Sequence, residues 1–305
     1  MKKNLLCMLA LAGMVLASCG SDTPGDGNTD NRVALQLEAG ISVKTRAYDK
    51  YWEENDRIGI YMFSPGTTSV IEGASNIPYE TVKGDGSFSP AGTTIYYPVD
   101  GSNVDFHAWY PYREVEDAWT IDLSEQGDQP AIDLMTAGAV SVDGGTVYNT
   151  HQPSVKFLFR HRLSKIVLEI EDGVGISPAD LEGLKVELTG QPTKVTYDPE
   201  FDALGMEKSY STITLNTSVD GQTAECIVFP NDVADNTPQV GRELVFTLES
   251  TGEVFYYTFP SDKSFDAGER NIYHITVNRT GLEVTSEIED WNPGNGEDGE
   301  SGSAE

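Results

Sequence analysis

Apolar residues alternate with small or polar residues along residues 33–43. The apolar positions, each two residues from the next, are Val33, Leu35, Leu37, Ala39, Ile41 and Val43. Successive side chains of a β-strand point to opposite faces of its sheet, so a period of two predicts a strand with one buried face. We therefore expect residues 33–43 to form a half-buried strand that ends at the basic sequence Lys44-Thr45-Arg46-Ala47.

Shorter apolar or aromatic segments recur through the rest of the chain. They cover residues 57–63, 93–97, 103–112 and 131–135 in the first half, and 184–188, 211–215, 224–229, 243–248, 254–259, 272–277 and 282–288 in the second. Turn sequences such as Lys83-Gly84-Asp85-Gly86-Ser87 separate them. Short strands separated by turns are typical of β-sandwiches, so we expect an all-β fold. Residues 178–184 alone suit a helix, of one or two turns.

The longest strand signal covers residues 155–170 and changes its parity halfway. One parity is shared by Phe157, Phe159, His161 and Leu163, and the opposite parity by Ile166, Leu168 and Ile170. The change near Leu163-Ser164-Lys165 predicts a bulge or a crossing of the chain between two sheets. We place a domain boundary there, which predicts an N-terminal β-sandwich domain in residues 33–162 and a C-terminal one in residues 163–291.

The first 18 residues have the pattern of an export signal. Lys2 and Lys3 precede an apolar stretch, residues 5–16, that is too short to span a membrane. The sequence Leu16-Ala17-Ser18-Cys19 resembles the bacterial lipobox, which implies cleavage before Cys19 and lipid attachment to it. An ordinary signal peptide with an incidental cysteine is the alternative. The composition of residues 19–32 predicts a flexible tether, and that of residues 292–305 a disordered acidic tail.

The formal net charge of −29 restricts the partners of the chain. Nucleic acid binding requires clustered cations, so this excess of carboxylates excludes it. The same charge disfavours contact with anionic lipid headgroups, which leaves acyl chains on Cys19 as the link to a membrane. Cys7 is removed with the signal peptide, so Cys226 is the remaining free thiol and no intramolecular disulfide is expected. The alternation around Cys226 predicts a small buried side chain of a strand, not a nucleophile.

Signatures of catalysis are missing from the sequence, which contains no G-x-S-x-G, H-E-x-x-H, Walker or C-x-x-C motif. The four histidines lack ligand-like spacing, and we expect His161 to face a core and bond to a backbone carbonyl. Acidic segments at residues 114–117 and 125–128 fit no EF-hand loop, so solvated charge is favoured over calcium binding. The sequence Gly294-x-Gly296-x-x-Gly299 follows no strand and is attributed to chance. We expect no catalytic, cofactor-binding or metal-binding residues and no enzymatic activity.

The most aromatic stretch of the chain is residues 105–112. On a strand, Phe106, Ala108 and Tyr110 share one face, and His107 and Trp109 share the other. Such a stretch suits either a platform on which sugars stack or the core of a sandwich. We favour the core, because aromatic side chains supply a large part of the apolar area that cores bury.

Several short motifs follow one another in a characteristic order. They are the sequence Leu16-Ala17-Ser18-Cys19, Lys44-Thr45-Arg46-Ala47, Trp52 with Asp56-Arg57-Ile58-Gly59-Ile60-Tyr61, Ile95-Tyr96-Tyr97-Pro98, residues 105–112, Asp133-Leu134-Met135-Thr136-Ala137, residues 157–166, Ala267-Gly268 with Tyr273 and Val277, and Ile288-x-Asp290-Trp291. Through this order, the mature chain resembles the fimbrillin-like (FimA and Mfa type) surface lipoproteins of Bacteroidetes. The resemblance implies two tandem transthyretin-like β-sandwich domains, a lipid anchor in the outer membrane, and a place at the cell surface or in a fimbrium.

The resemblance also implies a route of assembly with other fimbrial subunits. A trypsin-like protease cuts shaft subunits of this family after an arginine, here Arg46 before Ala47, and the first strand leaves. A strand of the next subunit then fills the groove, here the one vacated by residues 33–43. Physical reasoning supports such an exchange, because an apolar groove with unpaired backbone groups is a template for strand addition. Head-to-tail exchange builds filaments and not closed dimers.

The C-terminal end of the chain departs from the pattern of shaft subunits. Residues 292–305 carry no apolar pattern that suits a donor strand. Leu282, Val284 and Ile288 are the alternative donors, unless they complete the second domain. The sequence therefore does not distinguish a tip, anchor or accessory subunit from a shaft subunit, and it does not identify the adhesion receptor. The alternative function is a surface lipoprotein that binds glycans and does not polymerise.

Overall fold

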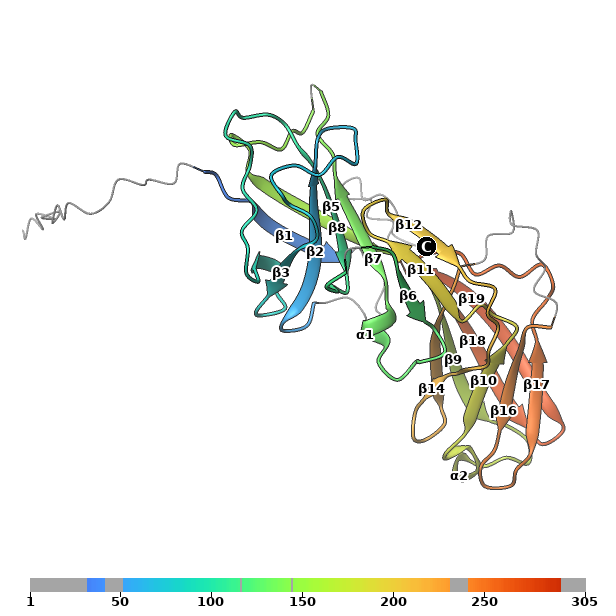
Figure 1. The fold of residues 1–305 in the computed structure, drawn as a ribbon. Helices are drawn as coiled ribbons and strands as arrows, with labels where there is room; N and C mark the ends of the chain where they lie inside the picture. The colour runs from blue at the N-terminus through green and yellow to red at the C-terminus, as the bar shows by residue number, and fades with distance from the viewer. Residues whose placement is uncertain (1–31, 42–51, 116, 144, 231–240, 292–305) are drawn as a thin grey trace, which may run out of the picture. The chain divides into compact units, whose positions relative to one another are not determined.

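The computed structural model describes residues 32–41, 52–115, 117–143, 145–230 and 241–291, which belong to one compact unit (Figure 1). Strands make up almost all of its regular structure, so the expected all-β class is confirmed. No helix in these ranges is both long and apolar enough to cross a membrane.

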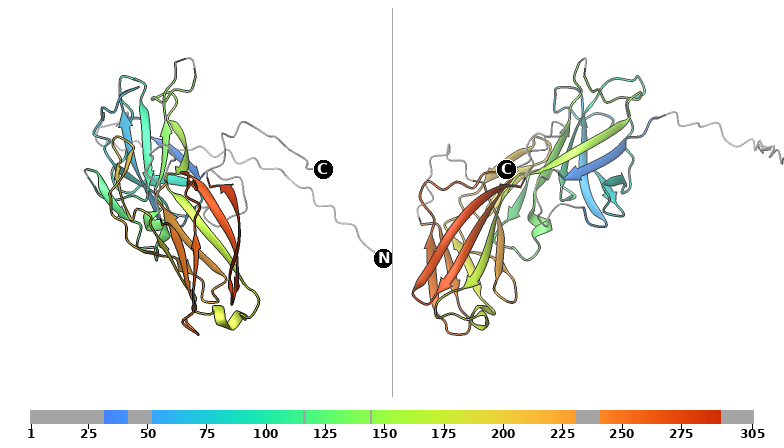
Figure 2. Two further views of the ribbon diagram at one scale, coloured as in Figure 1. Left: turned by 90° about the vertical axis from the view of Figure 1, so that its right-hand side faces the viewer. Right: turned by 180° about the vertical axis from the view of Figure 1, so that it is seen from behind.

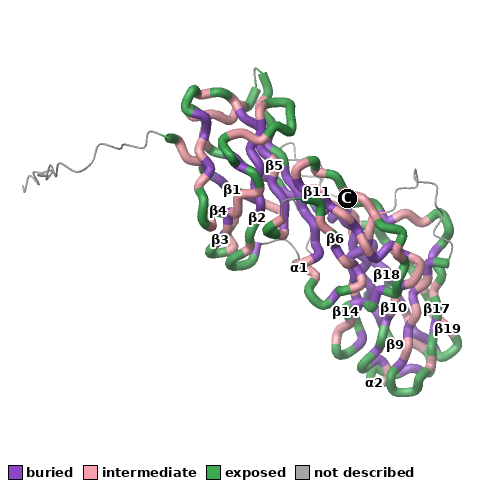
Figure 3. The backbone as a smooth tube through the Cα atoms, viewed as in Figure 1, coloured by how far each residue is buried: buried purple, intermediate pink, exposed green. Residues whose placement is uncertain are grey.

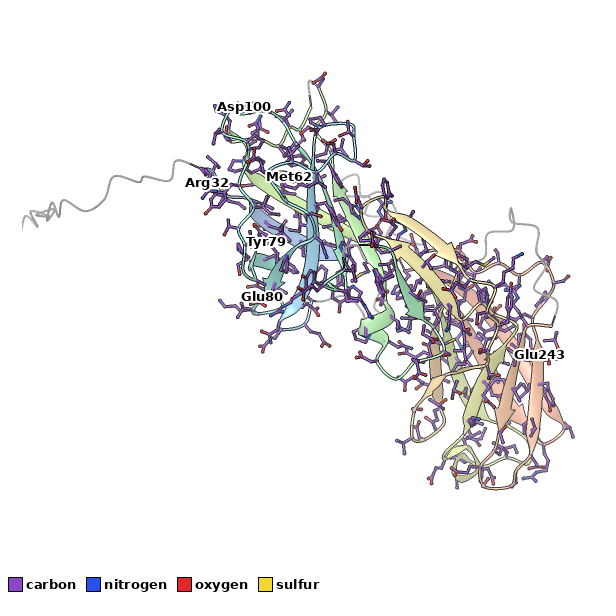
Figure 4. The ribbon with its side chains drawn as sticks, in the orientation of Figure 1. Arg32, Met62, Tyr79, Glu80, Asp100 and Glu243 are labelled. Atoms are coloured by element: carbon purple, nitrogen blue, oxygen red, sulfur yellow. The ribbon has the colours of Figure 1, made fainter. Side chains whose placement is uncertain are left out.

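Seven strands of the first half form a closed barrel, which we call the N-terminal barrel. In sheet order they are β1 (Gln36–Ile41), β4 (Ser87–Pro90), β3 (Ile77–Thr81), β2 (Asp56–Phe63), β5 (Asp105–Tyr110), β7 (Met135–Ala139) and β8 (Ser154–His161). All neighbours are antiparallel except β1 and β8, which run parallel. The barrel encloses an apolar core to which Met62 and Tyr79 belong (Figures 3 and 4).

The chain leaves the barrel after β8 and enters a different sheet as β9 (Ser164–Asp172). Phe157 and Phe159 are buried in the barrel core, whereas Ile166 and Leu168 are buried in a second core. The predicted change of parity is therefore confirmed as a crossing between sheets.

Two sheets of the second half pack around this second core (Figure 2). One contains β13 (Ile213–Thr214), β10 (Lys185–Thr189), β16 (Glu243–Thr247) and β17 (Val254–Thr258); the other contains β14 (Asn216–Thr217), β15 (Thr223–Val228), β9, β18 (Glu269–Asn278) and β19 (Gly281–Asp290). Cys226 lies fully buried between the sheets, as expected, and burial raises the pKa of its thiol.

A third sheet connects the two halves of the chain. Its strands are β6 (Trp119–Asp122), β11 (Lys194–Asp198) and β12 (Ala203–Met206), and β6 of the first half pairs with β11 of the second. A third apolar core contains Trp109, Leu163, Tyr197 and Ile227. Because of this shared core, the division into two domains at residues 162 and 163 stays a prediction.

Two local predictions of the sequence analysis are wrong. Residues 131–134 do not form a strand, because the short helix α1 (Gln129–Ile132), with Pro130 in its first turn, lies there and β7 begins only at Met135. Residues 93–97 contribute only an isolated bridge, in which Tyr96 pairs with Ala34. The expected short helix in residues 178–184 is confirmed as α2 (Pro178–Leu181).

His161 is buried as expected, but its partner differs from the expected one. Its Nδ1 lies 2.8 Å from a carboxylate oxygen of Asp133, not at a backbone carbonyl. Its ring stacks on Trp291 at a centroid distance of 3.8 Å. The alternation of residues in β8 predicts the face on which His161 lies. The side chains that contact it there come from distant segments, Trp291 after β19 and Asp133 before β7.

Gly59 of β2 lies under a hydrogen bond between Trp109 Nε1 and Asn76 Oδ1, which are 3.1 Å apart. A Cβ atom at position 59 would lie 2.6 Å from Trp109 Nε1. We expect Gly59→Ala to lower the free energy of unfolding by about 1–3 kcal/mol through overpacking, measured by urea denaturation. Gly40→Ala is the control, since nothing lies within 4 Å of a Cβ there. Equal effects of the two changes would contradict the prediction.

His107 of β5 contacts the second half of the chain through the hydroxyl of Tyr197, 3.1 Å from its Nε2. Burial holds the pKa of His107 below its ordinary value. In the unfolded chain the imidazole of His107 takes up a proton near pH 6.5, whereas in the folded chain it does not. The free energy of unfolding therefore falls as pH falls below about 6.5. We expect a shallower decline between pH 7.5 and 5.5 in His107→Gln, measured by urea denaturation. Parallel curves for variant and wild type would refute this.

Candidate functional site

β1 occupies the space between β4 and β8, which we call the β1 slot. On one side it pairs with β8 over six residues, from Gln36 opposite Ser154 to Ile41 opposite Phe159. On the other side it pairs with β4 at two positions only. Residues ahead of β1 add two further backbone bonds on this side, from Leu35 N to Ile95 O at 3.0 Å and from Tyr97 N to Val33 O at 2.9 Å.

The two faces of β1 differ as the alternation predicts. Leu35, Leu37 and Ala39 are 6%, 7% and 4% exposed and belong to the barrel core. Gln36 and Glu38 are exposed. Burial of one Leu side chain is worth about 1.5–3 kcal/mol, so the two leucines alone give β1 a large part of its affinity for the slot.

The indole of Trp52 completes the hydrogen bonding of β1 where β4 ends. Ala39 N donates to Gly86 O at 2.8 Å, and Trp52 Nε1 donates to Ala39 O at 2.8 Å. No further strand residue can take the place of the indole, because the chain turns at Gly84 and Gly86, which both have positive φ. A Cβ atom at Gly86 would lie 2.6 Å from Ala39 O, so the close approach requires glycine.

Trp52 is itself held by aromatic side chains of the barrel core. Its ring packs edge-on against Phe88, Tyr110 and Phe159, at centroid distances of 5.0, 5.4 and 5.2 Å. Edge-to-face pairs of this kind each contribute about 0.5–1.5 kcal/mol beyond their buried area. These ring contacts hold the indole N–H in the orientation in which it donates to Ala39 O.

A small cavity of about 90 Å³ lies at the C-terminal end of β1. Ile41, Trp52, Asp56 and Asp133 line it, among others. The hydroxyl of Tyr110 donates to Asp56 Oδ1 at 3.1 Å. Burial raises the pKa of Asp56 above its ordinary value. The slot thus ends beside two carboxyl groups, near the point where the chain continues toward the basic sequence at residues 44–47.

The structure brings together only part of the predicted site. Leu35, Leu37, Ala39 and Ile41 lie in or beside the barrel core, and Val33 packs against it. The predicted residues Cys19, Val43, Arg46 and Ala47 lie outside the described residues, so lipidation and processing stay predictions. Ahead of β1, the guanidinium carbon of Arg32 lies 4.1 Å from the ring centre of Tyr96 (Figure 4).

Sequence reasoning missed Trp52 and Gly86 as residues of the site. A lone tryptophan between a basic segment and a strand gives no sign of its partner. The sequence Lys83-Gly84-Asp85-Gly86-Ser87 was identified as a turn, but its close approach to Ala39 depends on the closure of the barrel.

The alternative of a sugar platform on the aromatic stretch is not supported. Trp109 is 0% exposed and belongs to the third core, and its ring is tilted by 37° against that of Trp119. Phe106, Ala108 and Tyr110 lie in the barrel core, as the sandwich interpretation predicted. Within the described ranges, no group of three or more His, Cys, Asp or Glu side chains is arranged to hold a metal ion.

Comparison with known proteins gives one family model and three related proteins. The model of the fimbrillin-like family matches residues 45–291. A Bacteroides uniformis protein named as a candidate fimbrium subunit, Fim1C, is 42% identical over 321 positions that cover 100% of both chains. The crystal structure of a candidate cell adhesion protein from the same species has a TM-score of 0.73 and 36% identity, over 87% of this chain and 99% of that one. A candidate cell adhesion protein from Bacteroides ovatus shares the fold, with a TM-score of 0.67, 22% identity and the same coverage.

The hydrogen bond from Trp52 to Ala39 can be tested by Trp52→Phe, which keeps an aromatic ring and removes the donor. The buried carbonyl of Ala39 then loses its partner, so we expect the free energy of unfolding to fall by about 1–3 kcal/mol, measured by urea denaturation. Trp119→Phe is the matched control, because the indole N–H of Trp119 has no hydrogen-bond partner among the described residues. A loss in the control as large as in Trp52→Phe would contradict a role for this bond.

Proposed function

We propose that this chain, which belongs to the fimbrillin-like family, is a fimbrial subunit or fimbria-associated adhesin of the cell surface that assembles by exchange of its first strand. In this proposal β1 leaves the slot after proteolysis, and a strand of another subunit takes its place. Assembly with other fimbrial subunits follows from the family; the exchange of strands is our own inference.

The observation that carries the proposal is the position of β1 in the barrel. It closes the sheet between β4 and β8, yet it comes from the N-terminal end of the chain. Cleavage between Arg46 and Ala47 would separate it covalently from every other strand of the barrel. The bonds to Gly86 and to the indole of Trp52 use main-chain atoms of β1, and the bond to Ile95 uses the main chain of Leu35 just before it, so all three are available to any strand that replaces this segment.

The release of β1 would leave a groove that favours a new strand. Two edges, β4 and β8, would lose their ladder, and the apolar core beneath Leu35 and Leu37 would be exposed to water. Unpaired strand edges beside an apolar groove bind extended segments through main-chain hydrogen bonds. The family match begins at residue 45, directly before the proposed cleavage site.

We also propose that the chain is exported as a lipoprotein. Cleavage before Cys19 and acylation of Cys19 would anchor it in the outer membrane, with residues 19–32 as the tether. Proteolysis after Arg46 would then release the subunit from its anchor together with β1, so that one cut both frees the subunit and opens the slot. A subunit that escapes this cut would stay at the membrane as an anchor.

The proposal predicts that Arg46→Ala abolishes assembly. When the variant is expressed in its native host, we expect an N-terminus at Cys19 in place of Ala47 and no fibres by electron microscopy, since β1 stays attached. Lys44→Ala is the control, because it changes a nearby basic residue and keeps Arg46. Fibres formed by Arg46→Ala, with Cys19 still at the N-terminus, would rule out removal of the first strand as a condition for assembly.

A further inference from the structure

A lysine amine and a buried side-chain amide meet at the start of β18. Asn271 is 0% exposed, and its Oδ1 lies 2.6 Å from Nζ of Lys263, which belongs to the segment between β17 and β18. On the other side of the amide, Asn271 Nδ2 donates to Ser164 Oγ at 3.2 Å, and Ser164 Oγ donates to Glu269 O at 3.1 Å. Hydrogen bonds therefore fix both ends of the amide, and the amine of Lys263 is in contact with its carbonyl group.

The surroundings of Lys263 favour an uncharged amine. Its Nζ lies 5.2 Å from the ring centre of Phe265, and the guanidinium carbon of Arg242 lies 5.1 Å from the same centre. Burial lowers the pKa of the Lys263 amine. Arg242 lowers this pKa further, whereas Glu269 and Asp266 raise it. An amine that has lost its proton carries a free lone pair and can act as a nucleophile.

A carboxyl group that can relay a proton lies two residues before the amide. Glu269 and Asn271 share one face of β18, because the side chains of a strand alternate. The charges of Glu269 and Lys263 each shift the pKa of the other group, so the two groups lie within electrostatic reach. Burial and the charge of Asp266 raise the pKa of Glu269. A carboxyl group with a raised pKa keeps its proton more often, so it can both give and accept one.

We propose that Lys263 and Asn271 form an intramolecular isopeptide bond, which joins the segment after β17 to β18. The uncharged Nζ of Lys263 attacks Cγ of Asn271 and forms the new C–N bond, while an electron pair of the carbonyl group moves to Oδ1. That pair then returns, the Cγ–Nδ2 bond breaks, and Nδ2 leaves as ammonia with a proton from Nζ that Glu269 relays. One amine and one primary amide thus give one secondary amide and one ammonia, without an oxidant, a cofactor or another reactant.

The bond would shorten the connection between the two sheets of the second half. β17 is an edge strand of one sheet, and β18 is an inner strand of the other. Cys226 is the one cysteine in the part of the chain that the structure describes, so a disulfide cannot link these elements there. A covalent link stabilises a fold by limiting the conformations of the unfolded chain. The inference goes beyond the proposed function and does not depend on strand exchange.

The bond can be detected in tryptic peptides of the full chain, which is unfolded before digestion. Trypsin cleaves after an unmodified lysine, but not after a lysine whose amine is acylated. We expect a branched peptide in which residues 243–270 are joined to residues 271–279, at a mass one ammonia below the sum of the two. Linear peptides 243–263, 264–270 and 271–279 at full mass would show an ordinary hydrogen bond and overturn the proposal.

The digest also distinguishes the bond from another reaction of Asn271. An asparagine that closes on its own backbone to a succinimide loses one ammonia as well, but it leaves Lys263 open to trypsin. A linear peptide 271–279 that lacks one ammonia would therefore overturn the link to Lys263.

Variants of the two linked residues test the assignment. Lys263→Arg keeps a positive charge and hydrogen-bond donors but has no primary amine, so we expect no branched peptide from it, nor from Asn271→Ala. Lys185→Arg is the matched control, because it alters a lysine whose Nζ contacts a carboxylate, that of Glu187 at 2.8 Å. A branched peptide that persists in Lys263→Arg would overturn the assignment, and so would its loss in Lys185→Arg.

The relay through Glu269 is tested by the rate of bond formation. We expect Glu269→Gln to slow the appearance of the branched peptide after synthesis about a hundredfold, as for the loss of a general acid–base group. An unchanged rate would overturn the role of Glu269. The wild-type digest alone decides whether the bond exists, so the proposal stays testable where a variant does not fold. The digest involves neither Arg46 nor β1, so its failure would leave the proposed function standing.

Discussion

The closure of the N-terminal barrel by β1 is the constraint on which the structure depends. β1 gives both β4 and β8 a neighbour, and its leucines cover the core formed by the other six strands. Beyond the end of β4, Ala39 N donates to Gly86 O, and Ala39 O accepts from Trp52 Nε1. Both backbone groups of Ala39 on this side of β1 therefore have a hydrogen-bond partner. Each of these contacts is replaceable in principle, because they involve main-chain atoms and simple apolar side chains.

The features that could be predicted from the sequence are local ones. The alternation in residues 33–43 identified the buried face of β1, because the period of a strand is a property of neighbouring residues. The change of parity at Leu163-Ser164-Lys165 likewise predicted the passage from β8 to β9. The burial of Phe106 and Tyr110 followed from the size of aromatic side chains. The order of the short motifs along the chain indicated the resemblance to the fimbrillin-like family, and the family match agrees with it.

The features that escaped prediction depend on contacts between distant residues. β1 pairs with β8 although Gln36 and Ser154 are 118 residues apart, and no local pattern encodes that register. The third core and the pairing of β6 with β11 depend on both halves of the chain. The helix α1 replaced an expected strand because Pro130 suits a helix start. The carboxylate of Asp133 beside His161 could not be paired with it from sequence alone.

In the proposed exchange, the attachment of β1 to its own chain would favour β1 over a strand of another copy. While the chain remains uncut after Arg46, β1 would compete as part of the same molecule, and an intramolecular strand has an advantage in effective concentration over a separate one. A strand of another copy would compete only at the concentration of that copy. Cleavage after Arg46 would remove this advantage of β1. Proteolysis therefore need not alter any contact of the barrel to favour exchange; it is sufficient that β1, once it dissociates, no longer returns.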